Sequence, residues 1–181
     1  VEFLAGEIRN LLHDAEASKA YFLTETMGRS AGWLAYGAAI AGEASLVISV
    51  EDIIGSYRVS ESYTDESSGK TETREVMDVD RVIGRIVKTM TARDAEGKHF
   101  GVIVLAEGLA ELLPMKYLKG IPRDEHGHIS ISHVNLGRMF AKLVSDEYKR
   151  QTGSGRKVTG LQLGYESRCG KPQAFDVMFG S

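Results

Sequence analysis

Three short segments carry side chains suited to binding an anion or a sugar. The first is Met27-Gly28-Arg29-Ser30, which lies where a helix is expected to begin. Gly28 lets a ligand approach the backbone, and the Arg29 guanidinium offers a fork of donors that matches a phosphate group. The free N–H groups and partial positive charge of a helix start add to this preference for an anion. A tight turn with a surface arginine would give the same pattern, so both interpretations stay open.

The other two segments are centred on Glu107 and on the pair Tyr165 and Arg168. A carboxylate such as Glu107 can accept hydrogen bonds from sugar hydroxyls, although a helix-capping glutamate is an alternative. A phenol and a guanidinium three residues apart can converge on one phosphate, although a turn with a packed tyrosine and a solvated arginine is also possible. None of the three segments alone is specific for a binding site. The informative property is that each segment follows a predicted strand.

The elements that must position these residues alternate between helix and strand. Helices are predicted at about residues 2–18, 30–42, 79–90 and 132–153, and strands at about residues 20–26, 45–50, 100–105 and 157–164. The helices repeat apolar residues at three and four, whereas the strand at 100–105 is a continuous apolar run typical of burial on both faces. Residues 55–75 predict a surface loop or an exposed hairpin, residues 114–131 a loop, and Ser132 a helix N-cap.

This alternation predicts an α/β fold, a three-layer sandwich with a mostly parallel, Rossmann-like sheet, in a single domain over residues 1–181. Ligands of such folds bind at the carboxyl ends of the strands. The segments that follow the predicted strands are residues 27–30, 51–53, 106–109 and 165–169. We therefore expect the side chains of Arg29, Glu107, Tyr165 and Arg168 to line one cleft.

Composition and charge exclude several other classes of function. The formal net charge is −3, so nothing drives the whole chain toward nucleic acid or an anionic membrane, and an anion site needs a local cluster of Arg and Lys. No apolar run approaches the roughly 20 residues that span a bilayer, and no signal-peptide pattern is present. A single cysteine cannot form an internal disulfide and fits a reducing, cytoplasmic compartment. The beginning at Val1 and the ending at Ser181 suggest a piece of a longer protein.

The remaining reactive residues are assigned no chemical role. Three histidines invite a zinc interpretation, but no fourth ligand is evident, and a solvated loop is the preferred interpretation: His126, His128 and His133. Cys169 has no evident general base nearby in the sequence and is interpreted as a bystander thiol. Trp33 and Tyr36, on the helix rich in small residues, are predicted to belong to the core.

In order and spacing, the three segments resemble the signatures of the phosphofructokinase family. Glu25–Trp33 resembles the Met-Gly-Arg segment, and its Ala-Gly-Trp resembles the pyrophosphate-dependent and long-chain branches. Gly101–Gly108 resembles the family's strand ending in Pro-Glu-Gly, with Ala106 in place of the proline. Gly164–Asp176 resembles the C-terminal signature. Three ordered motifs over about residues 19–178 are more specific than any one alone.

The resemblance implies the fructose 6-phosphate-binding half of an enzyme that transfers a phosphoryl group from pyrophosphate or ATP to the 1-hydroxyl of fructose 6-phosphate, in glycolysis. It implies substrate-binding roles for six residues: Met27, Gly28, Arg29, Glu107, Tyr165 and Arg168. Arg29 would lie near the transferring phosphoryl group as a catalytic residue. Glu107 would bind sugar hydroxyls, and Tyr165 with Arg168 would bind the 6-phosphate.

The resemblance also implies Mg²⁺ in the parent enzyme and a homo-oligomer in which a neighbouring subunit completes the sugar-phosphate site near Lys19. Two arginines of the family are replaced by Ala20 and Thr159, with Lys19 and Lys157 as weak substitutes. The family's glycine-rich donor loop and aspartate-rich base segment have no counterpart, and no metal ligands are evident. Because phosphoryl transfer needs donor, metal and acceptor together, the chain alone is expected to be inactive.

Two alternatives stay open beside this interpretation. One is a sugar-phosphate-binding module without catalysis, and the other is an unrelated α/β fold whose motifs coincide. The second alternative predicts that Arg29, Glu107 and Arg168 are scattered over different faces of the molecule.

Overall fold

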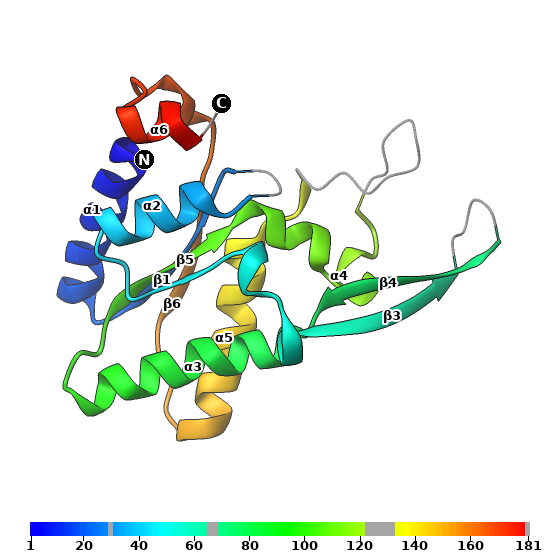
Figure 1. Cartoon of the computed structure of the whole chain (residues 1–181). Helices are drawn as coiled ribbons and strands as arrows, with labels where there is room; N and C mark the ends of the chain where they lie inside the picture. The colour runs from blue at the N-terminus through cyan, green and yellow to red at the C-terminus, as the bar shows by residue number, and fades with distance from the viewer. Residues whose placement is uncertain (29–30, 65–68, 122–132, 180–181) are drawn as a thin grey trace.

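A parallel sheet forms the centre of the molecule (Figure 1). The computed structural model describes residues 1–28, 31–64, 69–121 and 133–179. Within these ranges the sheet has four strands in the order β2-β5-β1-β6. Their bounds are β2 Leu46–Ile48, β5 Gly101–Ala106, β1 Tyr21–Thr26 and β6 Val158–Leu163. All three pairings between neighbouring strands are parallel, as predicted.

Helices cover both faces of this sheet, which makes three layers. Helices α1 (Glu2–Ser18) and α2 (Trp33–Ala41) pack on one face, and α3 (Val79–Ala95) and α5 (Leu136–Thr152) form the layer on the other. Alternate strand residues enter the two cores, with Leu23 buried on the α3 and α5 side and Phe22 on the α1 and α2 side. Figure 1 shows α2 above the sheet and α3 below it. The predicted α/β sandwich is therefore confirmed.

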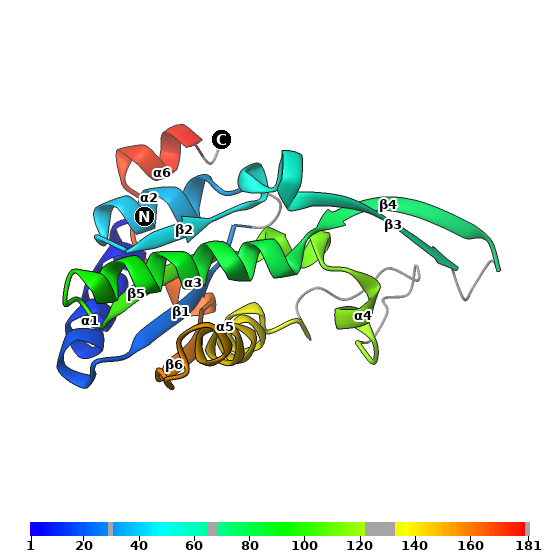
Figure 2. The same cartoon turned by 90° about the horizontal axis from the view of Figure 1, so that it is seen from below.

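A long hairpin projects from the body of the molecule (Figures 1 and 2). Strands β3 (Arg58–Thr64) and β4 (Thr71–Met77) pair antiparallel in a separate two-stranded sheet. Of the two predictions for residues 55–75, the exposed hairpin is thus confirmed and the irregular loop is wrong. Its polar sequence fits because most side chains of both strands face solvent.

Short helical segments connect the main elements. They are η1 (Val50–Asp52), η2 (Gly55–Tyr57), η3 (Glu107–Leu112), α4 (Met115–Leu118), η5 (Tyr165–Cys169) and α6 (Ala174–Phe179). Helix α4 contradicts the loop predicted over residues 114–131 for its first part, and residues 122–131 lie outside the described ranges. None of the helices in the described part of the chain has the length and apolar character that crossing a membrane requires.

Two further predictions, the N-cap Ser132 and the core position of Trp33 and Tyr36, are wrong. The N-cap of α5 is Asn135, whose side chain accepts a hydrogen bond from the Arg138 N–H at 2.8 Å, and not Ser132. Trp33 and Tyr36 are half-buried and do not belong to the core. The Tyr36 hydroxyl reaches outward and donates to Asp52 Oδ2 at 2.6 Å, because its polar tip needs a partner.

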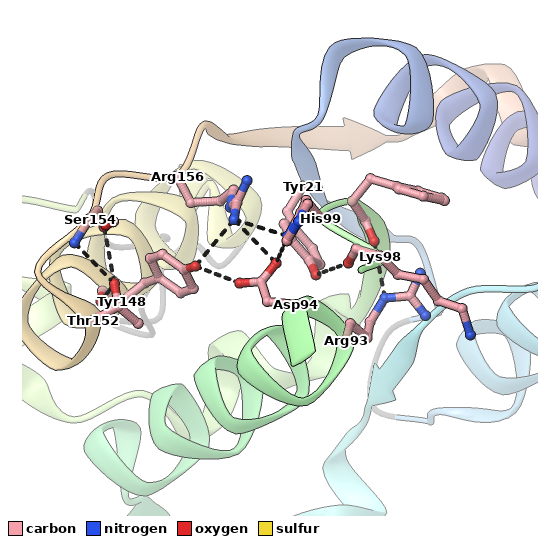
Figure 3. A network of polar contacts seen from close by, with 10 residues as sticks. Tyr21, Arg93, Asp94, Lys98, His99, Tyr148, Thr152, Ser154 and Arg156 are labelled. Carbon is pink, nitrogen blue, oxygen red and sulfur yellow. Dashed lines mark hydrogen bonds and ion pairs between the residues drawn. The ribbon is translucent and has the colours of Figure 1, made fainter. Parts of the chain in front are cut away.

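A polar network ties the elements together at the amino ends of the strands, opposite the segments singled out above (Figure 3). Asp94, at the end of α3, contacts the Tyr148 hydroxyl of α5, His99 Nδ1 at 2.8 Å and the Arg156 guanidinium at 3.2 Å. Burial opposes ionisation of Asp94, but these hydrogen bonds and the charge of Arg156 outweigh it and lower its pKa. The network joins α3, α5 and the loops before β5 and β6, so it holds the strand starts in register.

Candidate functional site

The register of the sheet brings the predicted segments to one edge. Thr26, the last residue of β1, pairs with Ala106 of β5 on one side and with Leu163 of β6 on the other. The segments that follow β5, β1 and β6 therefore leave the sheet side by side, and the one that begins with Met27 is in the middle. This is the carboxyl edge at which α/β folds bind ligands.

A hydrogen bond links the first two segments directly. The Gly28 N–H donates to Glu107 Oε2 at 3.1 Å, across 79 residues of sequence. Glu107 is the first residue of η3, and its carboxylate reaches the backbone at the end of β1. Carboxylate oxygens accept hydrogen bonds from both N–H and O–H donors.

A pocket of about 400 Å³ lies at this edge, which we call the strand-end pocket. Met27, Gly28 and Glu107 line it together with residues from the start of α1, the start of α2, η5 and the segment before α6. The volume suits a small ligand, because pockets for such molecules measure about 300–1,000 Å³. The structure thus brings Met27, Gly28 and Glu107 together at one cavity.

The other three predicted residues are only partly covered by the structure. Arg29 lies outside the described residues. Tyr165 and Arg168 belong to η5, which follows β6 at the same edge and contributes Ser167 to the strand-end pocket. The side chains of Tyr165 and Arg168 lie outside the described part, so the convergence of all four side chains stays a prediction.

Two residues that the sequence interpretation did not select also line the strand-end pocket. Trp33, at the start of α2, was predicted to be core, and Lys171 lies just before α6. Lys171 adds a cation to a pocket that also contains the carboxylates of Glu2, Glu107 and Asp176. A lysine ammonium can pair with a phosphate group, and carboxylates can accept hydrogen bonds from hydroxyl groups. The position of Lys171 in the segment after the last strand was the available signal, since that segment had been singled out for Tyr165 and Arg168.

Glu25, the last but one residue of β1, is a buried carboxyl between the strand and the start of α5. Its side chain is only 2% exposed. Its Oε2 accepts a hydrogen bond from the Leu136 N–H at 3.0 Å, and its Oε1 accepts one from Gln162 at 3.3 Å. Burial raises the pKa of Glu25 to about 7, and the charge of Glu107 adds to this, against the hydrogen bonds from the start of α5. Its role was not predictable from local pattern, because a glutamate within a strand is normally expected to face solvent.

A close contact between α5 and β6 delivers those N–H groups to Glu25. A Cβ on Gly160 would collide with the carbonyl of Gly137, and a Cβ on Gly137 would collide with the Leu161 carbonyl oxygen. Only glycine at both positions lets the first turn of α5 press against the strand. The helix start then supplies donors and a partial positive charge to the buried carboxyl.

The zinc and thiol alternatives gain nothing from the structure. His126 and His128 lie outside the described residues, and His133 lies three residues before the start of α5. Across the described ranges, no group of three or more His, Cys, Asp or Glu side chains is placed to hold a metal ion. Cys169 is exposed and unbonded to another cysteine.

The fold and this pocket define an α/β protein whose candidate ligand site lies at the carboxyl edge of a parallel sheet. The family model described as "Phosphofructokinase" matches residues 1–181. The chain belongs to the phosphofructokinase family. The family predicted from the three motifs is thereby confirmed.

Individual relatives agree with this membership. The chain is 34% identical over 183 residues to a pyrophosphate–fructose 6-phosphate 1-phosphotransferase of Naegleria fowleri, covering 97% of the chain and 38% of that protein. It is 27% identical to an ATP-dependent 6-phosphofructokinase of Corynebacterium efficiens, covering 97% of the chain and 41% of that protein. The chain thus spans about two-fifths of the length of these relatives.

A solved structure supports the fold. The phosphofructokinase of Saccharomyces cerevisiae aligns with a TM-score of 0.55 and 21% identity, covering 97% of this chain and 17% of that one. At this identity the similarity concerns the architecture alone, and it agrees with the three-layer α/β arrangement described above.

Proposed function

We propose that this chain is the fructose 6-phosphate-binding domain of a phosphofructokinase that transfers a phosphoryl group from pyrophosphate or ATP to the 1-hydroxyl of the sugar. The observation that carries the proposal is the hydrogen bond between Gly28 and Glu107 at the strand-end pocket. It joins the Met-Gly-Arg segment to the strand that ends in Glu-Gly, beside the backbone of the C-terminal signature. Family membership supports the same assignment.

The proposed roles follow from the chemistry of each group. The Glu107 carboxylate accepts hydrogen bonds from sugar hydroxyls, while Met27 and Gly28 form the wall of the pocket nearest to it. Arg29 stabilises the transferring phosphoryl group as the catalytic residue. Tyr165 and Arg168 bind the 6-phosphate, to which Lys171 contributes a further positive charge.

The parent protein that we propose is a cytoplasmic, homo-oligomeric enzyme of glycolysis. Its phosphoryl donor would be bound by residues outside this chain. Both ATP and pyrophosphate are proposed as donors, because the relatives include an ATP-dependent and a pyrophosphate-dependent enzyme. Mg²⁺ would assist transfer in the parent enzyme. The described residues offer no cluster of ligands for it, so none of them is assigned to the metal.

Two substitutions in the full-length enzyme test the assignment. Arg168→Ala should raise the KM for fructose 6-phosphate about ten- to a hundredfold and leave the KM for the donor nearly unchanged, because a charged hydrogen bond is worth roughly 1.5–3 kcal/mol. Arg168→Lys should recover part of the loss, since lysine keeps the charge but loses the fork. Arg29→Ala should lower kcat more than it raises KM, because its role lies in the transition state.

Steady-state kinetics with each substrate varied in turn separate these outcomes. Lys142→Ala, which removes an exposed cation from α5, is the matched control and should leave both constants unchanged. An unaltered KM for fructose 6-phosphate in Arg168→Ala would show that the 6-phosphate site is elsewhere. Binding of fructose 6-phosphate by the full-length protein without turnover with either donor would instead assign the non-catalytic sugar-phosphate-binding module.

A further inference from the structure

A second pocket, of about 370 Å³, lies between α3 and η2 and shares no lining residue with the strand-end pocket. We call it the basic pocket, and six residues line it: Ser56, Tyr57, Arg81, Gly84, Arg85 and Lys88. Figure 2 shows the first half of α3 beside the teal turn that precedes β3, which contains η2. Nothing in the family motifs or the strand-end chemistry accounts for this cavity.

The spacing of the α3 residues gathers their charges on one face of the helix. Arg81, Gly84, Arg85 and Lys88 follow the pattern i, i+3, i+4 and i+7, which aligns side chains along a single stripe. The apolar residues of the helix, including Val82 and Ile86, lie on another face and are buried in the core. Like charges at this spacing repel one another, so the stripe costs the isolated helix stability and calls for an opposing charge.

The protein itself supplies only part of that opposing charge. Arg81 Nε donates to Asp78 Oδ2 at 3.1 Å, and Arg85 donates to Asp52 Oδ1 at 3.3 Å. A guanidinium has five donors, so each arginine keeps N–H groups beyond the one used. Within the described residues Lys88 makes no ion pair. Three cations therefore face two carboxylates, which leaves a positive excess at the pocket.

The carboxylates and Tyr57 also limit how far the arginines can move. The Arg85 guanidinium lies 6.0 Å from the centre of the Tyr57 ring while it is paired with Asp52. Groups held in place before a ligand arrives lose less conformational freedom on binding. Ser56 and Tyr57, from η2, line the other side of the pocket, and each carries a hydroxyl group that can donate a hydrogen bond.

Gly84 leaves the centre of the basic pocket open. A Cβ built at Gly84 meets no atom within 4 Å, and its φ is not positive, so neither packing nor backbone conformation requires glycine there. Glycine inside a helix is less stable than alanine. The missing side chain instead lets a ligand approach the helix between the cations.

We propose that the basic pocket binds a small phosphorylated molecule, at a site separate from the strand-end pocket. Several cations arranged around neutral hydroxyl donors match the charge and the multiple acceptor oxygens of a phosphate group. The volume of about 370 Å³ is sufficient for a phosphate or a small phosphate ester. The proposal does not depend on which sugar phosphate occupies the strand-end pocket.

Titration calorimetry on the full-length protein tests the proposal, with inorganic phosphate and glycerol 3-phosphate as probes. Fructose 6-phosphate is kept saturating, so that the strand-end pocket does not contribute heat, and chloride at equal ionic strength serves as the blank for screening. A phosphate ester that binds more tightly than inorganic phosphate would indicate a metabolite site, and the reverse order would indicate a site for free phosphate. Either result supports the proposal.

Variants locate the binding. Lys88→Ala should weaken it about tenfold or more, whereas Lys142→Ala, an exposed cation on α5, should have no effect. Gly84→Leu should abolish binding because its side chain fills the cavity, and Gly84→Ala should reduce binding less because a methyl group is smaller. Both variants should keep the helix, since leucine and alanine favour helix more than glycine does. Unchanged thermal unfolding and unchanged fructose 6-phosphate affinity would show that the variants are folded.

Two results would overturn the proposal. One is the absence of phosphate binding beyond the chloride blank in the native protein. The other is phosphate binding that persists at full strength in both Lys88→Ala and Gly84→Leu, which would place it outside the basic pocket.

Discussion

Replacing Glu25 with glutamine tests the electrostatics of the carboxyl that is buried between β1 and the start of α5. Burial raises the pKa of this carboxyl from 4.5 to about 7 in the folded protein, with a further contribution from the charge of Glu107. Between these two values the folded state holds a proton that the unfolded state has lost. The stability that this proton contributes is therefore complete below pH 4.5 and is lost as the pH rises to about 7.

The size of the effect follows from the same two pKa values. One pKa unit corresponds to 1.36 kcal/mol, so the accumulated loss at pH 8 is roughly 3 kcal/mol. Glutamine has nearly the same shape and keeps an oxygen that can accept the Leu136 N–H, but it cannot ionise. We expect Glu25→Gln to be more stable than the native chain at pH 8, by roughly 3 kcal/mol at most, and similar to it near pH 4.5.

Urea unfolding of the 181-residue chain between pH 4.5 and 8 measures this difference, with Trp33, its single tryptophan, as the fluorescent probe. Glu16→Gln, at an exposed position of α1, is the matched control. Groups whose ionisation does not depend on Glu25 affect native and variant chains alike, so they cancel in the difference. Native and Glu25→Gln curves that stay parallel over the whole range would refute the reasoning, because Glu25 would then not titrate there.

Two further predictions concern the contacts that support the sheet. Gly160→Ala should destabilise the chain by several kcal/mol or prevent folding, because its methyl group collides with the carbonyl of Gly137, while Gly155→Ala, which meets nothing, should have little effect in the same thermal melts. Asp94→Asn should cost about 2 kcal/mol at pH 7. Because the pKa of Asp94 is lowered, its contribution is present above pH 3.8 and is lost as the pH falls below it. The gap between native and Asp94→Asn in urea unfolding should thus shrink near pH 3, and a constant gap would contradict the assignment.

Local pattern was sufficient for the main elements of this chain. The apolar repeat of α3 and the continuous apolar run of β5 each reflect a period set by backbone geometry, and both elements are found close to the predicted bounds. The C-terminal end of α5 at Gly153 was also predictable, since its φ of 71° favours glycine. These features depend on residues near one another in sequence.

The start of α5 and the role of Trp33 were not predictable in this way. Ser132 and Asn135 are both good N-caps by type, and the contact between Gly137 and Gly160 brings a strand from elsewhere in the chain against the first turn of the helix. Trp33 is apolar and lies on a helix rich in small residues, which favours a core assignment. It lines a pocket because α2 begins at the carboxyl edge of the sheet, which only the packed structure shows.

The sequence by itself determined the family, the order of the elements and the three segments that follow strands. It could not determine that β1 lies between β5 and β6, because strand order depends on how the connections cross the sheet. That order is what places Gly28 within 3.1 Å of Glu107. The buried Glu25 and the basic pocket likewise depend on tertiary structure, since charge and burial there come from side chains that are distant in sequence and close in space.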